Sequence, residues 1–378
     1  MNYDLTIEQE MIKKLIREFT EKEIAPYDEE MDRTGEFPWE IIKKMKDAEL
    51  FGISFPEEYG GAGGDEICEA IVLEEMARGS ASTAITLDTH MLCATAILTF
   101  GTEEQKKKYL PDLVSGNKLG AFALTEPSAG SDVGGIQSKA VLEGSEYILN
   151  GQKAWITNAH VADVFVVAAL TNPSLGTRGI SCFIIEKDFS GFMLGNKEDK
   201  MGIRGSDTGE LIFDNCKIPK ENLLGEEGMG FKIAMISLDS GRIGIGAIGV
   251  GIAQHAMEEA IKYARERKAF GRTISQLQAI QFKIADMVTG IEASRALVYK
   301  AAYKKKNHEK FTLDSAMAKL MASEVAMKTT KDAIQVFGAY GYSREYPMER
   351  LMRDAKVLEI GEGTSEVLRM LIGSKALR

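Results

Sequence analysis

The chain has 378 residues, of which 44% are hydrophobic and 27% charged, and its formal net charge is -10. This length predicts two or three domain-sized units, and the composition is typical of a globular protein. The acidic balance disfavours a nucleic-acid-binding protein, which normally presents a basic face. Apolar runs fall short of the roughly 20 residues needed to span a bilayer, so we expect no membrane insertion.

Four cysteines and four histidines are scattered along the chain. The cysteines form no CxxC pair, and a chain of this length does not depend on disulfides for its stability. The histidines show no metal-ligand spacing. We therefore expect a cytoplasmic protein without a bound metal.

Three segments that differ in the spacing of their apolar residues follow one another along the chain. Residues 1–120 carry apolar residues at helical spacing, as at Ile12 and Leu15, which predicts an α-helical domain. From 121 to 229 the pattern changes to short β-type runs bounded by turn residues. We expect six to eight strands there, with Asn150–Gly151 at a hairpin turn.

Residues 230–378 return to helical spacing. The predicted helices cover residues 230–267, 276–306, 312–337 and 365–376. Four such helices fit an antiparallel bundle. The expected fold is therefore α+β and multidomain, with an N-terminal α-helical domain, a middle β-barrel-like domain and a C-terminal four-helix bundle.

Gly244–Gly249 matches the GxGxxG pattern of dinucleotide-binding folds. In those folds the pattern follows a buried strand and opens a helix. Here the helical spacing continues on both sides, so we interpret the glycines as sites of close helix packing. A nicotinamide-dependent dehydrogenase is correspondingly disfavoured.

Two segments of the middle domain carry side chains suited to a flat polar ligand. Leu124–Gly135 combines hydroxyls with glycines, which let the backbone approach a ligand closely. Further on, strand alternation places Trp155 and Thr157 on one face. On chemistry alone, a turn-rich loop and a core tryptophan are the competing interpretations.

Glu362 lies between two glycines, just before a predicted helix that Thr364 caps. Such a loop can bring a carboxylate close to a ligand, although an exposed turn glutamate fits the same pattern. Upstream, Arg265–Arg272 ends a long helix with positive charge. That charge suits either the helix dipole or a bound phosphate.

Taken in order, these segments resemble the acyl-CoA dehydrogenase family along almost the whole chain, and bacterial short-chain, butyryl-CoA-type members in particular. The resemblance rests on Leu124–Gly135, Lys153–Asn158, Arg267–Gly271, Gln335–Tyr342, Arg353–Lys356 and Glu362–Thr364. It implies the three-domain fold, with FAD extended between the β-domain and the bundle. It also implies a homotetramer in which a neighbouring subunit completes each FAD site.

The resemblance assigns roles to individual residues. Cofactor contacts are implied for Leu124, Thr125, Gly130, Ser131, Trp155, Thr157, Arg267, Phe270, Gln335, Gly338, Thr364 and Glu366. Substrate contacts are implied for Ser131, Asp239, Arg242, Gly361 and Gly363. Four of the cofactor residues, Arg267, Phe270, Gln335 and Gly338, are expected to touch the FAD of the adjacent subunit.

Glu362 matches the catalytic base of the family. The implied reaction converts a short-chain acyl-CoA, straight or branched, to its 2,3-enoyl-CoA. Glu362 removes the α-proton, FAD N5 accepts the β-hydride, and the electrons pass to electron-transferring flavoprotein. The FAD ribitol hydroxyl and the backbone N–H of Glu362 are implied to hold the thioester carbonyl and stabilise the developing enolate.

Two glycines depart from common patterns of the family. In some members the base stands just before the position of Arg242, where this chain has Gly241. Many straight-chain members carry a tyrosine before the base, where this chain has Gly361. The second departure predicts room for a branched or bulkier acyl group, while a short straight chain stays equally open.

Two alternative functions remain open at this point. The same active site serves a physiological enoyl-CoA reductase within an electron-bifurcating complex. The other alternative is a flavin-binding family member with non-dehydrogenase chemistry, against which the presence of Glu362 argues.

Overall fold

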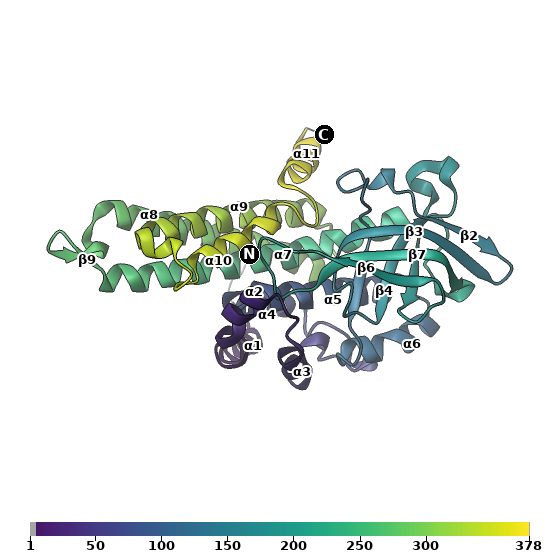
Figure 1. The fold of residues 1–378 in the computed structure, drawn as a ribbon, viewed down its shortest axis with the longest axis horizontal. Helices are drawn as coiled ribbons and strands as arrows, with labels where there is room; N and C mark the ends of the chain where they lie inside the picture. Colours follow the sequence, from purple (N-terminus) through teal and green to yellow (C-terminus); the bar gives the residue numbers. More distant parts are fainter. Residues whose placement is uncertain (1–4, 378) are drawn as a thin grey trace.

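The computed structural model describes residues 5–377 (Figure 1). Helices of the N-terminal part lie beneath the central helices, a β-sheet occupies one end, and the free end of a helical bundle forms the other. The expected order of an α-helical part, a β part and a second α-helical part is confirmed. Residues 1–4 and 378, at the outer ends of the first and third expected domains, lie outside the described residues.

The N-terminal part is helical because its apolar stripes coincide with good caps. Its helices are α1 (Ile7–Phe19), α2 (Asp28–Thr34), α3 (Trp39–Asp47), α4 (Glu66–Gly79), α5 (Ala81–Phe100) and α6 (Glu103–Val114). Thr6 and Thr102 each form a capping box with the glutamine three residues later. Ser80 caps α5 through the backbone N–H of Thr83. The two helices α4 and α5 pack against the long helix α7 (Gly230–Glu266).

The middle part is one eight-stranded sheet. Its strands are β1 (Gly120–Ala123), β2 (Lys139–Glu143), β3 (Glu146–Thr157), β4 (Val164–Leu170), β5 (Ile180–Glu186), β6 (Phe192–Lys197), β7 (Thr208–Pro219) and β8 (Leu223–Leu224). The order is β6-β7-β3-β2-β4-β5-β8, and β1 pairs with β4 in parallel. The ring centroids of Phe192 in β6 and Phe165 in β4 lie 5.0 Å apart although three strands separate β6 from β4 in the sheet order, which shows that the sheet is curled.

The predicted hairpin turn at Asn150–Gly151 is wrong. Both residues lie inside β3, where the pairing with β7 shifts register between Leu149 and Gly151. A Cβ at Gly151 would overlap the side chain of Ser138. The glycine therefore serves a β-bulge with close backbone approach rather than a turn. The β2–β3 hairpin instead turns after Glu143, which pairs with Glu146.

The C-terminal part contains three long helices and two short ones. These are α7, α8 (Gln278–Lys306), α9 (Thr312–Phe337), α10 (Met348–Lys356) and α11 (Ser365–Ala376). The first three pack on one another, and the short α10, which the sequence pattern did not indicate, packs against α9. The helix α11 also contacts α9 but stands away from the bundle axis (Figure 1).

The glycine-rich run 244–249 lies inside α7, which is helical on both sides of it. A Cβ at Gly246 would come within 2.9 Å of Val298 on α8, and one at Gly249 within 3.1 Å of the carbonyl of Ala322 on α9. The interpretation of these glycines as helix-packing sites is therefore confirmed.

Two helices, α5 and α7, are long and apolar enough to span a membrane by length and composition. In the folded chain, however, 72% and 78% of their most apolar windows are buried. This burial identifies both as core helices of the folded chain.

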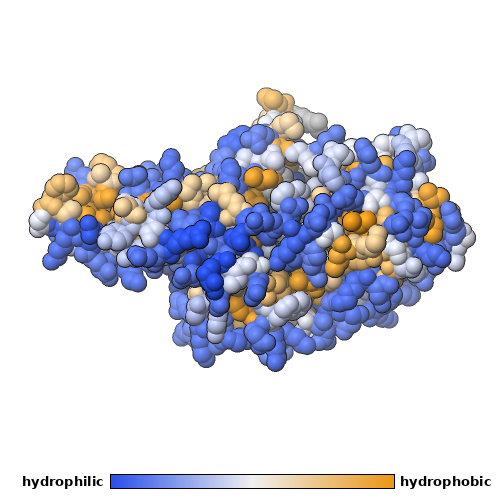
Figure 2. Space-filling model, in the orientation of Figure 1, coloured by the Kyte–Doolittle hydropathy of each residue, from blue (hydrophilic) through white to orange (hydrophobic). Residues whose placement is uncertain are grey.

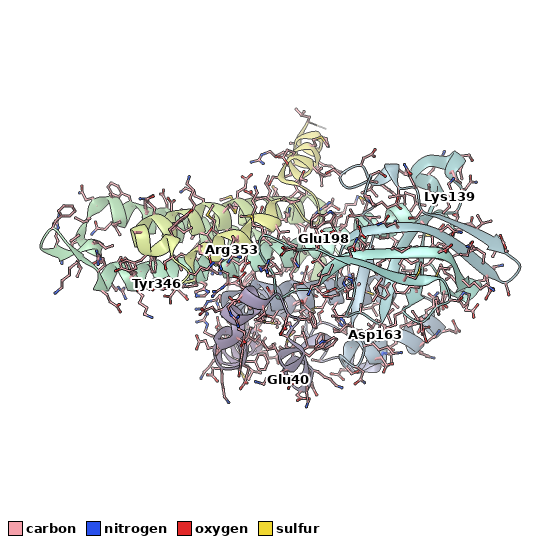
Figure 3. The ribbon with its side chains drawn as sticks, viewed as in Figure 1. Glu40, Lys139, Asp163, Glu198, Tyr346 and Arg353 are labelled. Carbon is pink, nitrogen blue, oxygen red and sulfur yellow. The ribbon has the colours of Figure 1, made fainter. Side chains whose placement is uncertain are left out.

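An ion-pair cluster joins the parts at their common junction. The guanidinium of Arg353 on α10 binds both carboxylate oxygens of Asp32 on α2, at 2.7 and 2.6 Å. It also donates to the carbonyl of Met201, in the segment that leads into β7. Figure 3 shows Arg353 at the centre of the molecule, between the bundle and the N-terminal helices. The Arg353–Lys356 motif thus has a structural role.

Candidate active site

The loop that carries Glu362 has an unusual backbone. Glu362 adopts φ +53° and Gly363 φ +102°, so two consecutive residues lie at positive φ. A non-glycine residue in this region is strained, and such strain is typical of functional sites. The loop is held at its end by Thr364, whose Oγ1 accepts a hydrogen bond from the N–H of Val367 at 3.3 Å. The expected cap of α11 is therefore present.

The carboxyl of Glu362 points at the middle of α7. A Cβ at Gly241 would overlap Glu362 Oε2, so only glycine at position 241 leaves space for this carboxyl. Oε2 is buried and has no hydrogen-bond partner among residues 5–377. Part of the residue itself remains accessible. The carboxyl is thus directed into the interior without a fixed protein partner.

Burial raises the pKa of Glu362 to about 7, while the positive charges of Lys319 and Arg242 oppose the rise. Lys319 is fully buried on α9, and its Nζ donates to the carbonyl of Gly363 at 2.6 Å. Desolvation lowers the pKa of Lys319 to about 8. A carboxyl whose pKa lies near neutrality is suited to take up and release a proton at physiological pH.

Asp239 and Arg242 form a second buried group, one turn apart on α7. Nη1 of Arg242 donates to Oδ1 of Asp239 at 2.6 Å. Oγ1 of Thr312 donates to the other oxygen of Asp239, also at 2.6 Å. Arg242 lies beside the Glu362 loop, with its Nε 3.5 Å from the carbonyl of Glu362. The two predicted substrate residues therefore border the predicted base.

The predicted cofactor residues of the middle domain lie together. The N–H of Ala154 donates to the carbonyl of Thr125 at 3.0 Å, which joins the loop after β1 to β3. An extra residue in β3 forms a bulge there, and Trp155 adopts φ +59° with 61% of its surface exposed. Thr157 is half-buried, whereas Ile156 is buried. Trp155 and Thr157 thus share the open face, as alternation predicted.

A buried ion pair holds the Leu124–Gly135 loop in place. Lys153 and Glu126 are both buried, with Nζ 2.7 Å from Oε1. Lys153 also donates to the carbonyl of Leu124 at 3.1 Å. Glu126 accepts the N–H groups of Gln137 and Ser138 at 2.6 and 3.1 Å. These bonds hold both ends of the Leu124–Gly135 loop, while Gly130 and Ser131 near its middle stay exposed.

We expect Lys153→Met to destabilise the protein by about 3 kcal/mol, because removing one partner leaves the other charge buried and unpaired. Urea unfolding at pH 7 measures this change in the free energy of unfolding. The double variant Lys153→Met, Glu126→Gln is the control and should recover part of the loss. A Lys153→Met protein as stable as wild type would show that the pair does not hold the loop.

Four predicted cofactor residues lie at the opposite end of the molecule. Arg267 caps the C-terminus of α7, and Phe270 lies in the turn between β9 (Lys268–Ala269) and β10 (Arg272–Thr273). Gln335 and Gly338 lie at the end of α9. Phe270 is 90% exposed. Figure 1 places β9 at the free end of the bundle, far from β3, and Figure 2 shows hydrophobic side chains at that end.

The remaining predicted cofactor residues, Thr364 and Glu366, lie at the start of α11. Glu366 is exposed, and its pKa is lowered by a hydrogen bond from its own backbone N–H and by Thr364. Gly361 and Gly363 flank the base. A Cβ at Gly361 would meet only the carbonyl of Val357, at 3.6 Å. Gly361 is therefore not required by sterics, whereas Gly363 is favoured by its positive φ.

Two charged residues near Glu362 were missed by the sequence reasoning. They are Lys319 on α9 and Asp88 on α5, and both are buried. A signal was present for each. Asp88 is the only acidic residue in the twenty residues of α5, and Lys319 interrupts a buried run of small residues that includes Ala318 and Ala322. A lone charge on an otherwise apolar helix face indicates a paired or functional residue.

The arrangement defines a class of protein. A strained loop directs a carboxyl of raised pKa into the interior, and a separate face combines an exposed tryptophan with hydroxyls, as a flat redox cofactor requires. Together these features are those of a flavin-dependent oxidoreductase that removes a proton from its substrate.

Comparison with known proteins identifies the family. Family models of the acyl-CoA dehydrogenase N-terminal, middle and C-terminal domains match residues 6–117, 121–216 and 228–377. A short-chain-specific acyl-CoA dehydrogenase of Clostridium acetobutylicum is 51% identical, with both chains covered completely. An acryloyl-CoA reductase (NADH) of Anaerotignum propionicum is 49% identical, covering 100% of this chain and 96% of its own.

A solved structure agrees with these relatives. A chain in the structure described for the electron-transferring flavoprotein of Acidaminococcus fermentans, in work on flavin-based electron bifurcation, superposes with a TM-score of 0.99. It is 51% identical and covers both chains completely. This chain belongs to the acyl-CoA dehydrogenase family. It is an FAD-dependent oxidoreductase, and the resemblance inferred from its motifs is confirmed.

Proposed function

We propose that this protein removes hydrogen from C2 and C3 of a short-chain acyl-CoA and forms the 2,3-enoyl-CoA, with Glu362 as the base. The observation that supports this most directly is the buried, unpartnered Oε2 of Glu362 opposite Gly241, within the described residues. The pKa of about 7 allows Glu362 to be ionised at neutral pH and to accept the α-proton.

The residues around Glu362 divide the work. Lys319 and Arg242 supply positive charge that opposes complete neutralisation of the base. We infer that the backbone N–H of Glu362 binds the thioester carbonyl, where it stabilises the charge that develops on oxygen. The bound flavin supplies the two-electron acceptor. Asp239 and Arg242 are placed to contact the CoA portion, beside the base.

The described side chains fit FAD. We infer that Leu124 and Thr125 meet the edge of the flavin ring, with Trp155 and Thr157 beside it. Gly130 and Ser131 are exposed on the adjoining loop and can reach phosphate oxygens. Thr364 and Glu366 are inferred to contact the adenosine end. The ion pair of Lys153 and Glu126 supports this face without belonging to it.

We infer a homotetramer in which each FAD is shared between two subunits. The strand β3, which carries Trp155, lies far from β9, which adjoins Phe270, at the free end of the bundle (Figure 1), so one FAD reaches both only where two chains meet. The exposed aromatic side chains of Phe270, Phe282 and Tyr342 favour such an interface. The proposed domains cover residues 1–120, 121–229 and 230–378, close to the starts of β1 and α7.

Arg267→Ala should weaken FAD retention, because it removes a cation inferred to contact the FAD of the neighbouring subunit. We expect the absorbance ratio of flavin to protein to fall several-fold after gel filtration at low protein concentration. Arg265→Ala is the matched control, because Arg265 is also an exposed arginine and lies two residues earlier, on α7. Equal flavin retention in both variants and wild type would remove Arg267 from the cofactor site.

The acyl group is short, and the glycine at position 361 leaves room beside its Cα and Cβ. A Cβ at position 361 would meet only the carbonyl of Val357, so the space beside Gly361 is open and the backbone does not require glycine there. We therefore propose that isobutyryl- or isovaleryl-CoA is accepted beside butyryl-CoA. The family resemblance and the relatives support electron-transferring flavoprotein as the partner. A cytoplasmic location fits the four free, buried cysteines.

The opposite direction is the second candidate function. It is favoured by the 49% identity to an acryloyl-CoA reductase and by the similarity to a chain from work on electron bifurcation. The same base would then deliver its proton to Cα. NADH-driven reduction of crotonyl-CoA in the presence of an electron-transferring flavoprotein would establish this direction.

Anaerobic titration of the yellow protein with acyl-CoAs tests the proposed function. We expect butyryl-CoA or one of its branched analogues to bleach the flavin absorbance, and the enoyl-CoA to appear in stoichiometric amount. If flavin-loaded protein is bleached by none of them, and crotonyl-CoA does not reoxidise the chemically reduced flavin, the proposed reaction is wrong.

A further inference from the structure

A second buried carboxyl, that of Asp88 on α5, faces the same stretch of α7 as Glu362. Asp88 is only 3% exposed, and its Oδ2 has no hydrogen-bond partner within residues 5–377. A Cβ at Gly244 would overlap Asp88 Oδ1. Position 244 therefore has to be glycine for Asp88 to lie here, in the same way that Gly241 makes room for Glu362.

The two glycines place the two carboxyls one helical turn apart. Residues three positions apart on a helix lie on one face, with Cβ positions about 5–6 Å from each other. Glu362 and Asp88 therefore approach neighbouring positions on the same face of α7. Each carboxyl has one buried, unpartnered oxygen, among the residues that the structure describes.

The surroundings of Asp88 disfavour its charged form. Burial raises the pKa of Asp88 well above its usual range, the negative charges of Glu362 and Glu69 raise it further, and only Lys305 acts in the opposite sense. Neither Glu69 nor Lys305 forms a hydrogen bond or ion pair with Asp88. A buried carboxyl without a partner is costly to the folded state. Such a group is retained where a ligand completes it.

The position of Asp88 indicates which part of a ligand reaches it. Asp239, an inferred CoA contact, precedes Gly241 on α7, Gly241 faces the base, and Gly244 comes three residues later. The step from Gly241 to Gly244 advances about 4.5 Å along α7. Three bonds separate C2 of an acyl chain from a substituent atom on C4, and three bonds of an extended chain span a similar distance, roughly 3.5 Å. If Glu362 acts at C2, a substituent on C4 of the acyl chain lies nearest Asp88.

We propose that Asp88 is a specificity-determining residue that accepts a hydrogen bond from a hydroxyl or ammonium group on C4 of the acyl chain. This inference rests on the proposed function. It deepens that function by predicting a polar short-chain acyl-CoA, rather than a plain alkyl one, as the preferred substrate. A hydroxyl would pair with the buried Asp88 carboxyl, and an ammonium would in addition stabilise its ionised form by forming an ion pair.

A pair of substrates that differ in one group tests the proposal. 4-Hydroxybutyryl-CoA and pentanoyl-CoA are nearly the same size but end in a hydroxyl and a methyl group. We expect wild-type protein to prefer the hydroxyl compound by about tenfold to a hundredfold in kcat/KM, the effect of leaving a buried polar group without its hydrogen bond. Asp88→Leu, which keeps the size, should reverse this preference.

Two further arms identify the ligand group and the role of the charge. Asp88→Asn keeps an acceptor for a hydroxyl but not a negative charge. It should therefore retain 4-hydroxybutyryl-CoA and lose 4-aminobutyryl-CoA, tested at pH 6 where the amine stays protonated. Thr89→Val, a buried substitution at the next position of α5, is the matched control and should leave every ratio unchanged.

Equilibrium binding separates this proposal from the proposed function. Calorimetric titration of the FAD-loaded protein with 4-hydroxybutyryl-CoA and pentanoyl-CoA gives their Kd ratio whether or not either is oxidised. A Kd ratio near one that Asp88→Leu does not change overturns the role of Asp88, even if butyryl-CoA bleaches the flavin. A ratio that Asp88→Leu reverses supports it, even if no bleaching occurs and the proposed reaction fails.

Discussion

Glu362→Gln is expected to abolish reduction of the flavin by acyl-CoA while leaving FAD bound. The amide has nearly the shape of the carboxyl but cannot take a proton, and a positioned general base contributes up to about 10⁴-fold to the rate. Stopped-flow absorbance under anaerobic conditions measures the effect. Glu359→Gln is the matched control, because Glu359 lies three residues away and pairs with Lys356 rather than with the base. Rapid bleaching in the Glu362→Gln protein would exclude Glu362 as the base.

The same substitution should change how stability depends on pH. The pKa of Glu362 is raised from 4.5 to about 7, so the folded protein binds this proton more tightly than the unfolded chain. Its contribution to stability is therefore fully present below about pH 4.5 and is lost as the pH rises to about 7. The glutamine variant has no such loss, so it should gain stability relative to wild type between pH 5 and pH 8 in urea unfolding.

The second large effect is expected at Gly241. Gly241→Ala should reduce the rate of flavin reduction by about 100-fold, because the added methyl overlaps Oε2 of Glu362 and displaces the base. Gly249→Ala is the matched control. It adds the same methyl to α7, against the carbonyl of Ala322 rather than near the base.

The same position should also accept the base itself. In a Glu362→Gly protein, Gly241→Glu places a carboxyl in the space that Glu362 occupies. We expect it to recover about 100-fold of the rate lost by Glu362→Gly, measured with the same acyl-CoA in stopped flow. If the double variant is as inactive as Glu362→Gly alone while retaining FAD, a carboxyl on α7 cannot reach the α-proton.

Much of the helical structure was predictable because it follows local rules. The predicted bounds 312–337 and 365–376 coincide with α9 and α11, since apolar spacing and the Thr364 cap act over a few residues. The short helix α10 was not predicted. Its nine residues include Arg353, whose partners Asp32 and Met201 lie far away in the sequence. Tertiary ion pairs of this kind leave no local signature.

The middle domain shows where local signals mislead. Asn-Gly is a strong hairpin signal, yet Asn150–Gly151 lies within β3, because a bulge and a close approach to Ser138 also require glycine. Trp155 was placed correctly by alternation. Its left-handed backbone, by contrast, depends on an extra residue in β3 relative to β7, which the sequence of β3 alone does not reveal.

The candidate site divides in the same way. Glu362 was recognisable from its motif. Asp88 and Lys319 were recognisable only as lone charges on apolar helix faces, because their relation to Glu362 arises when α5, α7 and α9 pack together. No spacing rule connects residues 88, 319 and 362, and Gly244, which admits the carboxyl of Asp88, was first interpreted as a helix-packing glycine. The glycines of α7 therefore serve two purposes: some allow α8 and α9 to pack closely, and others make room for the carboxyls of Glu362 and Asp88.

The wide separation of β3, which carries Trp155, from the bundle tip at β9 also has a genetic consequence. If each flavin is held by the sheet of one subunit and the bundle tip of another, every chain contributes to two different sites. A chain with a damaged base and a chain with a damaged tip, such as Glu362→Gln and Arg267→Ala, are then each defective alone. Co-expressed in one cell, they would assemble some sites from two undamaged halves, so two defective alleles would complement each other.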